Sequence, residues 1–313
     1  MENKKYVVAI GSSSLDTYYE SLSWPALGDK VMVKKIGTKV GGLISNAACV
    51  MASCGIPTYL IDTVKPGLRE QIVQELDRYG VCTDYVTPGD ESIESETTII
   101  LVGGERTIFV SKNKPPIDLS PAQVRLFEEA AVVYSILPEI RKIRECETLL
   151  KSLKSKGVQL VWDMEPAAFN GGIEDQYLIK MADLLFFNEW GIEKYASDLS
   201  LPVNQAIAGL LDAGVRIVVL TLAKKGCRVF TKDREINVDG HRVSVVDVTG
   251  AGDSFNSVFI YGCLNGWALE RTAKMANAAG ARAVTLMGPK SGAATIEEIS
   301  GFLDQHEIKS AVV

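Results

Sequence analysis

Short runs of β-branched and other apolar residues alternate with helical segments along most of the chain. The clearest run, Ile217–Leu222, follows a helical segment over Asn204–Ala213 that ends at Gly214. Similar apolar runs occur at Tyr6–Ile10, Tyr59–Thr63, Val132–Leu137, Val158–Trp162 and Leu184–Phe187. Runs this apolar are typical of strands buried on both faces, and helical connections make consecutive strands parallel. The alternation predicts an α/β fold with a mostly parallel central sheet and helices on both faces.

Two segments interrupt this alternation, at about residues 14–40 and 95–112. The first contains glycine, proline and short β-like pieces, and the second includes Thr97–Val110, which is typical of a hairpin with Gly103-Gly104 at its turn. Neither segment fits a crossover helix, so we expect a small accessory β-sheet that acts as a lid. An edge extension or a homodimer contact through this sheet is the alternative. Without repeats or linkers, residues 1–313 are expected to form a single domain.

The composition excludes several classes of function. The chain has 33 basic and 39 acidic residues, a net charge of −6, and lacks a basic stripe that would attract nucleic acid. No apolar run approaches the roughly 18 residues of a membrane span, and the N-terminus does not resemble a secretory signal. The six scattered cysteines suit a reducing compartment. We expect a cytoplasmic protein that binds neither nucleic acid nor membranes.

A β-branched run gives way to a helical pattern at Gly250-Ala251-Gly252-Asp253. Both glycines can adopt positive φ, and the backbone N–H groups of residues 251–253 would then point outward at the positive end of the helix dipole. Such a turn binds an anion. A carboxylate beside that anion repels it unless the carboxylate has a role, and accepting the proton of an attacking hydroxyl is the obvious role for Asp253. Taken alone, these four residues also fit a simple turn with a helix cap.

Other nucleotide and nucleophile motifs do not fit the sequence. A dinucleotide-binding turn needs a third glycine, where Phe255 stands. The chain has no G-x-x-x-x-G-K-[ST] motif and no G-x-S-x-G motif around Ser254. Hydride transfer, P-loop chemistry and serine hydrolysis therefore lose support.

Polar residues near the N-terminus could contact a polyhydroxylated ligand. Gly41-Gly42 precede a helical segment that has Asn46 about one turn inside it, and Asp16 ends the segment that follows the first strand. An amide and a carboxylate can each bind hydroxyl groups. Taken alone, each of these residues is more often a loop cap than a ligand.

Two segments together resemble one family. "DVTGAGDSF" is similar to the C-terminal signature of the ribokinase-like (PfkB) carbohydrate kinases, and "GGLISNAA" resembles their N-terminal glycine-glycine signature. Order and spacing agree from Gly11 to about Gly288. The resemblance implies a ribokinase-like fold and the ATP-dependent phosphorylation of a hydroxyl on a small sugar or sugar-like substrate.

The resemblance also implies roles for individual residues. Asp253 would be the catalytic base. The anion hole for the transferred phosphoryl group would be formed by Gly250, Ala251 and Gly252. The substrate-binding positions would be Asp16, Gly41, Gly42 and Asn46.

ATP and magnesium are the implied cofactors. The segments "FFNEWG", "TLAKKG" and "MANAAGARAV" resemble the family's nucleotide-binding segments, and the matching positions are Asn188, Thr221, Gly226 and Asn277. Asp247 and Thr249 match a loop that binds a monovalent cation, such as potassium, in some members.

Two departures from the family pattern keep alternatives open. Gly191 stands where the family often has a glutamate, and Ala223 replaces the first glycine of the nucleotide turn. These changes leave a non-catalytic sugar or nucleotide sensor as one alternative. A nucleoside kinase of the same fold is another, and it would need an aromatic platform from Tyr18, Tyr19 or Trp24.

Overall fold

The computed structural model describes residues 6–103, 105–169 and 173–311. Within these ranges the largest sheet has nine strands, of which the first two in the spatial order pair antiparallel and the other seven are parallel. In spatial order they are β13 (Glu235–Val238), β12 (Cys227–Phe230), β11 (Ile217–Thr221), β10 (Leu184–Asn188), β9 (Gln159–Asp163), β8 (Val132–Ser135), β1 (Val7–Ile10), β4 (Thr58–Val64) and β5 (Val86–Pro88). The predicted central sheet is therefore confirmed.

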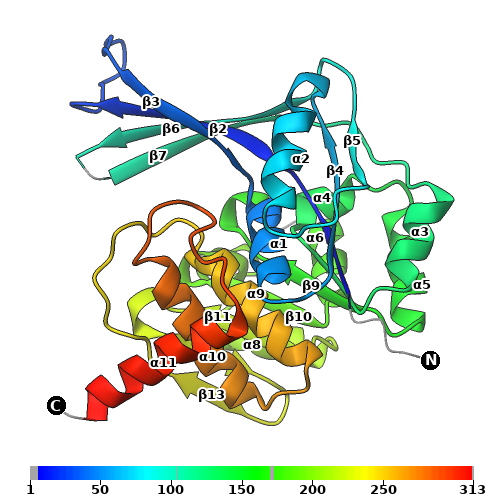
Figure 1. The fold of residues 1–313 in the computed structure, drawn as a ribbon. Coiled ribbons are helices and arrows are strands. Elements are labelled where there is room, and N and C mark those ends of the chain that lie inside the picture. The colour runs from blue at the N-terminus through cyan, green and yellow to red at the C-terminus, as the bar shows by residue number, and fades with distance from the viewer. Residues whose placement is uncertain (1–5, 104, 170–172, 312–313) are drawn as a thin grey trace.

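Successive residues of each central strand point to opposite faces of the sheet, and both faces are covered by helices (Figure 1). Val8 and Ile10 of β1 belong to the core beneath α3 (Pro121–Glu128), α4 (Leu137–Arg141), α5 (Cys146–Ser155), α6 (Ile173–Met181), α7 (Glu189–Asp198) and α8 (Val203–Asp212). Val7 and Ala9 belong to the core beneath α1 (Leu43–Ser53), α2 (Arg69–Asp77), α9 (Ala251–Leu264) and α10 (Leu269–Ala283). This arrangement explains the apolar runs, because both sets of side chains are buried.

Local sequence signals set several helix ends. At the start of α3, the Ser120 hydroxyl accepts a hydrogen bond from the Gln123 N–H, and the Gln123 side chain accepts one from the Ser120 N–H. Pro121 fits the first position of this helix, because its missing N–H would have no partner there. At the other end of the chain, α11 (Ile296–Ala311) packs on α10. No helix in the described ranges is long and apolar enough to cross a membrane.

A second, four-stranded sheet projects from the body (Figure 1). Its strands, in spatial order, are β3 (Lys34–Gly41), β2 (Ser14–Ser21), β6 (Glu94–Val102) and β7 (Glu105–Asn113). Val102 pairs with Glu105 across the hairpin turn, while Gly104 lies outside the described residues. The predicted accessory sheet is thus present, and its opening and closing as a lid stays a prediction.

Among the described residues there are also three short 3₁₀ turns: η1 (Pro66–Leu68), η2 (Pro166–Ala168) and η3 (Ala223–Lys225). The last of these contains Ala223, whose φ of 48° lies in the left-handed region. This is the position where the sequence lacks the glycine of the related nucleotide turn. The alanine therefore keeps a backbone conformation that glycine adopts at lower cost.

Candidate functional site

The glycine turn lies at the N-terminus of α9. Gly250 precedes the helix with φ 80° and ψ 3°, and a Cβ there would overlap the carbonyl oxygen of Pro289. Gly252 lies inside the helix, where a Cβ would meet no atom within 4 Å. The expectation of positive φ is therefore met at Gly250 and is wrong for Gly252, because the first helical turn has already formed there. In that turn the N–H groups have no carbonyl partner within the helix and can bind an anion.

Asp253 lies in the first turn of α9 and is buried, with 9% of its surface exposed. The side-chain amide of Asn46, on α1, donates a hydrogen bond to its carboxylate. Among the described residues, the Oδ1 atom of Asn46 has no hydrogen-bond partner although it is buried. The two helices are held together here by Ser257, whose hydroxyl donates to the carbonyl oxygen of Ala47 at 3.1 Å. The pair thus presents a carboxylate and an unused amide oxygen side by side.

Two further carboxylates face this group, and the sequence analysis did not identify them. Asp163, at the end of β9, accepts hydrogen bonds from the Asn256 amide at 3.0 Å and from the Tyr134 hydroxyl at 3.3 Å. Burial and the charge of Glu165 raise the pKa of Asp163 to about 7. Burial, followed by the negative charges of Asp163 and Glu165, raises the pKa of Asp253 well above its ordinary value. A carboxylate with a raised pKa is a suitable proton acceptor.

Asp163 could have been found from the sequence by its position. It is the last residue of β9, and ligands of open α/β sheets bind beyond the carboxyl ends of the strands. Asn188 and Thr221, at the ends of the neighbouring β10 and β11, were identified through the family resemblance. The apolar run before Asp163 predicts a strand that ends at this residue, so its position alone would have indicated it.

The expected substrate-binding residues meet where β2 and β3 join the body. The Ser14 hydroxyl donates a hydrogen bond to Asp16 at 2.7 Å, and a Cβ on Gly41 would overlap the Asp16 carboxylate. Gly42 has φ 108°, and a Cβ there would overlap the carbonyl oxygen of Ser12. Both glycines therefore allow the Asp16 carboxylate and the chain before it to lie against the start of α1.

The expected ATP-binding residues lie at the ends of β10 to β13 and on α10. Asn188 and Thr221 are directly paired across β10 and β11. Gly226 begins the return from β11 to β12, and a Cβ there would overlap the carbonyl oxygen of Val238. Asn277 donates from its side-chain amide to two carbonyls at the end of β13, each at 3.2 Å. The structure therefore brings these four residues to one edge of the sheet, with the Asn277 amide engaged in a contact within the protein.

The departure at Gly191 has a steric reason. The N–H of Gly191 donates to Oδ1 of Asn188 at 2.7 Å, so Asn188 caps α7. A Cβ at residue 191 would lie 2.7 Å from the carbonyl oxygen of Met164. A glutamate therefore does not fit without a backbone shift. Glu165 follows Met164 in the obstructing loop. This loop therefore supplies a carboxylate close to the position where the family often has its glutamate.

The expected monovalent-cation loop is held by hydrogen bonds of the protein itself. Asp247 accepts the N–H and hydroxyl of Thr249, at 2.9 and 2.6 Å, and the N–H of Gly288 at 3.0 Å. Arg106, from β7, forms an ion pair with Asp247 at 3.4 Å and donates to the Thr249 hydroxyl. Burial tends to raise the pKa of Asp247, but these hydrogen bonds and the arginine charge lower it below its ordinary value. The Asp247 carboxylate therefore stays ionised. Through Arg106, the accessory sheet also contacts Thr249, the residue before Gly250.

Solved structures share this fold. The structure of Arabidopsis thaliana ribokinase complexed with ribose and ATP matches with a TM-score of 0.81 and 24% identity, covering 96% of this chain and 98% of that chain. The Methanocaldococcus jannaschii nucleoside kinase matches with a TM-score of 0.78 and 18% identity, covering 96% and 99%. These similarities establish a ribokinase-like fold.

Sequence comparisons extend over the same length. The ribokinase of Bacillus subtilis is 27% identical over 300 residues, which cover 95% of this chain and 99% of that protein. An uncharacterized sugar kinase of Archaeoglobus fulgidus is 27% identical over 253 residues, which cover 77% and 97%. The profile described as pfkB family carbohydrate kinase matches residues 4–296. Because this match includes the glycine turn, Asp253 and the central sheet, the chain belongs to the pfkB family of carbohydrate kinases.

Proposed function

We propose that this protein transfers the γ-phosphoryl group of ATP to a hydroxyl of a small sugar or sugar-like substrate. The observation that carries the proposal is the position of Asp253. Its buried carboxylate lies in the first turn of α9, directly after the turn at Gly250, and accepts a hydrogen bond from the side chain of Asn46. A proton acceptor and a set of backbone donors for an anion are thereby held within one helical turn. Phosphoryl transfer requires these two elements together.

In the proposed reaction, the Asp253 carboxylate takes the proton of the substrate hydroxyl as its oxygen attacks the γ-phosphorus. The bond from the γ-phosphorus to the bridging oxygen breaks, and ADP leaves with that oxygen. The N–H groups of the first turn of α9 stabilise the charge on the transferred phosphoryl oxygens. No covalent intermediate with the protein is needed. Asn46 orients the base with its amide group and offers its Oδ1 atom to a substrate hydroxyl.

Magnesium fits the carboxylates near Asp253. Among the described residues there is no cluster of three or more His, Cys, Asp or Glu side chains that could hold a metal alone. Magnesium commonly binds through one or two carboxylates and the phosphates of the nucleotide, so such a cluster is not required. Asp163 and Glu165 would hold the ion, because a nearby cation would offset the repulsion that contributes to the raised pKa of Asp163. Bound magnesium would neutralise phosphate charge during transfer.

The lining of the substrate region favours a sugar over a nucleoside. Asp16, Ser14 and Asn46 provide polar atoms suited to hydroxyl groups. Of the aromatic residues that could form a platform, Tyr18 shares the face of β2 with Asp16, whereas Trp24 stacks on Phe109 with ring centroids 6.1 Å apart. A nucleoside remains the second substrate class to test, since a structural neighbour is a nucleoside kinase.

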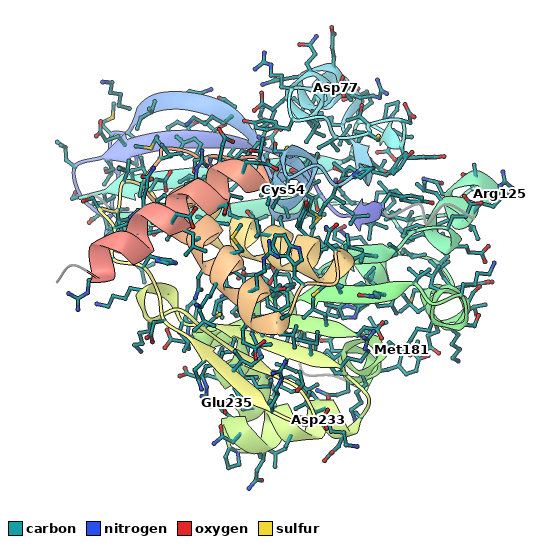
Figure 2. All side chains as sticks on the ribbon, turned by 60° about the horizontal axis from the view of Figure 1, so that its bottom comes forward. Cys54, Asp77, Arg125, Met181, Asp233 and Glu235 are labelled. Carbon is teal, nitrogen blue, oxygen red and sulfur yellow. The ribbon has the colours of Figure 1, made fainter. Side chains whose placement is uncertain are left out.

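The decisive experiment measures ADP release with magnesium and ATP across sugars, sugar acids and nucleosides, with and without potassium. Wild type is compared with Asp253→Asn and with Asp233→Asn, an exposed aspartate in the turn between β12 and β13 (Figure 2). Asp253→Asn should lower turnover by about 10²–10⁴-fold while ATP affinity stays near that of wild type. Asp233→Asn should behave as wild type.

The outcomes separate the alternatives. Near wild-type turnover in Asp253→Asn would exclude Asp253 as the base. ATP binding without substrate-dependent ADP release would instead indicate a sensor. Potassium activation that disappears in Asp247→Ala would support the cation role of that loop, whereas activity independent of potassium would agree with Arg106 as the counter-charge of Asp247.

We also propose that two copies associate through the accessory sheet. Large apolar side chains on and beside this sheet are exposed: Leu22, Trp24, Leu27, Met32, Ile36 and Phe109. Apolar exposure of this extent typically marks a contact with another protein surface. Sedimentation should show a wild-type dimer that Phe109→Glu dissociates. A wild type that is monomeric at tens of micromolar would refute the association.

A further inference from the structure

A cavity of about 470 Å³ lies where the accessory sheet meets the body. It is lined by residues 38–40 of β3, by α2 and its C-terminal turn (Gln71–Tyr79), and by the loop at residues 287–291. We call it the α2 cavity. Its lining includes neither Asp253 nor Asp16 nor Asn46, so it lies apart from the proposed base and the substrate-binding residues, and it touches the candidate site only through the loop at residues 287–291. Its volume lies in the range of cavities that bind small molecules, about 300–1,000 Å³.

The wall of the α2 cavity has an excess of positive charge. Among its described lining residues are three cations, Lys39, Arg78 and Lys290, and one carboxylate, Glu75. Glu75 is shared, because it pairs with Arg78 at 3.0 Å and with Lys290 at 3.3 Å. Three positive charges against one negative charge leave two unbalanced. Lys39 and Arg78 are exposed, so both can reorient towards a ligand.

The buried cation of the cavity is anchored at the junction of its three walls. The Lys290 side chain is 5% exposed, and its amine donates to the carbonyl oxygen of Val40 on β3 while it pairs with Glu75 on α2. Gln71 and Gln74 lie three residues apart on α2 and therefore share a helix face. The cavity thus combines fixed positive charge with amide groups that can bind hydroxyls.

A phosphate monoester matches this lining best. It carries between one and two negative charges near neutral pH and has three acceptor oxygens, which suits two unbalanced cations. A carboxylate brings one charge and would leave part of the excess unmatched. The glutamine amides suit the hydroxyl groups of a small phosphorylated sugar.

The cavity is coupled to the glycine turn through the loop at residues 287–291. The carbonyl oxygen of Pro289 lies against Gly250, and the N–H of Gly288 holds Asp247 at 3.0 Å. The Lys39 amine lies 3.7 Å from the position that a Cβ on Gly288 would take. A ligand that binds Lys39 and Arg78 would therefore hold this loop against β3 and α2, and through it the conformation of Gly250.

We propose that the α2 cavity binds the phosphate group of a small phosphorylated molecule and that this ligand stabilises the glycine turn of α9. The binding half is independent of the proposed kinase function. The second part, that the ligand stabilises the glycine turn, rests on the proposed kinase function, because it is measured as a change in kinase activity. Its expected consequence is a rise in kcat/KM for ATP of about five-fold or more, the usual lower range for coupling between two sites.

Binding is measured by calorimetry with the magnesium complex of a non-hydrolysable ATP analogue present in excess, so that the glycine turn is already occupied. The probes are inorganic phosphate, ribose 5-phosphate, glucose 6-phosphate and unphosphorylated ribose. The test variant is Lys39→Gln combined with Arg78→Gln, both on exposed side chains. The control is Arg125→Gln, since Figure 2 shows Arg125 well separated from Asp77, which precedes Arg78.

Phosphorylated probes should bind wild type and Arg125→Gln alike, and the double variant about ten-fold or more weakly, because charge-assisted contacts are lost. Tighter binding of an ester than of free phosphate would identify a phosphorylated sugar as the ligand, and equal binding would identify phosphate itself. Equal affinity in the double variant, or equal binding of ribose and ribose 5-phosphate, would overturn the binding half. Binding without a change in kcat/KM for ATP would overturn only the claim that the ligand stabilises the glycine turn.

Discussion

Replacing Gly252 with alanine separates the stability of the glycine turn from its proposed role in binding phosphate. Gly252 is already helical, and a Cβ there would meet no atom within 4 Å. The methyl group therefore fits the ligand-free protein. In the proposed reaction the same space is taken by the transferred phosphoryl group, so the methyl should obstruct the reaction while it leaves the fold intact.

The expected change in stability follows from helix propensity. Alanine is favoured over glycine in a helix by about 0.5–1 kcal/mol. The entropy of unfolding is about 2.1 cal/mol/K per residue, which for 313 residues gives about 0.7 kcal/mol/K. Gly252→Ala should thus raise Tm by about 1 °C. Loss of part of the anion hole should lower kcat/KM by about 10–10²-fold, somewhat less than removal of a whole donor.

Gly250→Ala is the matched comparison. Its φ of 80° costs an alanine about 1–2 kcal/mol, and the Cβ would also overlap the Pro289 carbonyl oxygen. This variant should lose at least 2 °C in Tm as well as activity. Calorimetry and ADP release on the same preparations give both quantities. An unchanged kcat/KM in Gly252→Ala would refute the anion hole at that residue, and a lower Tm would refute the open space around it.

Three other substitutions test separate features of the structure. Asp163→Asn removes a negative charge that raises the pKa of Asp253, so the acid limb of the kcat/KM profile, where Asp253 becomes protonated, should move towards lower pH; an unmoved limb would contradict this coupling. Gly191→Ala places a Cβ 2.7 Å from a backbone carbonyl oxygen and should destabilise the protein by about 1–3 kcal/mol in denaturant titration, whereas a stabilised variant would exclude the clash. Lys114→Met removes the cation that pairs with the carboxylate of Asp62. Because the two side chains are only 4% and 2% exposed, the unpaired carboxylate stays buried, and the free energy of unfolding should fall by about 3–5 kcal/mol. Adding Asp62→Asn should recover part of that loss, and no recovery would show that packing of the lysine stem dominates.

Much of the fold could be predicted from the sequence because its signals are local. A strand buried on both faces must be apolar throughout, so runs such as Ile217–Leu222 identify the central sheet without knowledge of their neighbours. The hairpin around residue 103 was predicted on the same basis, from two β-like runs with glycine between them. The glycine turn before Asp253 also depends on adjacent residues, and Gly250 takes the conformation that its position suggested.

The prediction for Gly252 was wrong because two glycines in a short segment do not reveal where the helix begins. The sequence allows positive φ at both, and the hydrogen bond from the Ser254 N–H to the Gly250 carbonyl decides that the helix has started before Gly252. The nucleotide-binding role of Asn277 stays a prediction. Its type and position match a nucleotide segment, and only the structure shows that its side-chain amide donates to carbonyls at the end of β13.

The sequence by itself determined the elements, the glycine turn and the residues within it, because each follows from the preferences of neighbouring residues. Only the tertiary structure brought Asp163 and Glu165 to Asp253, which lies about 90 residues further along the chain, and placed Arg106 on Asp247. It also formed the α2 cavity from three separate segments. The physical reason is that a pKa or a binding cavity depends on distances between side chains. Strand order and helix packing fix those distances, and neither is encoded in the local pattern of the chain.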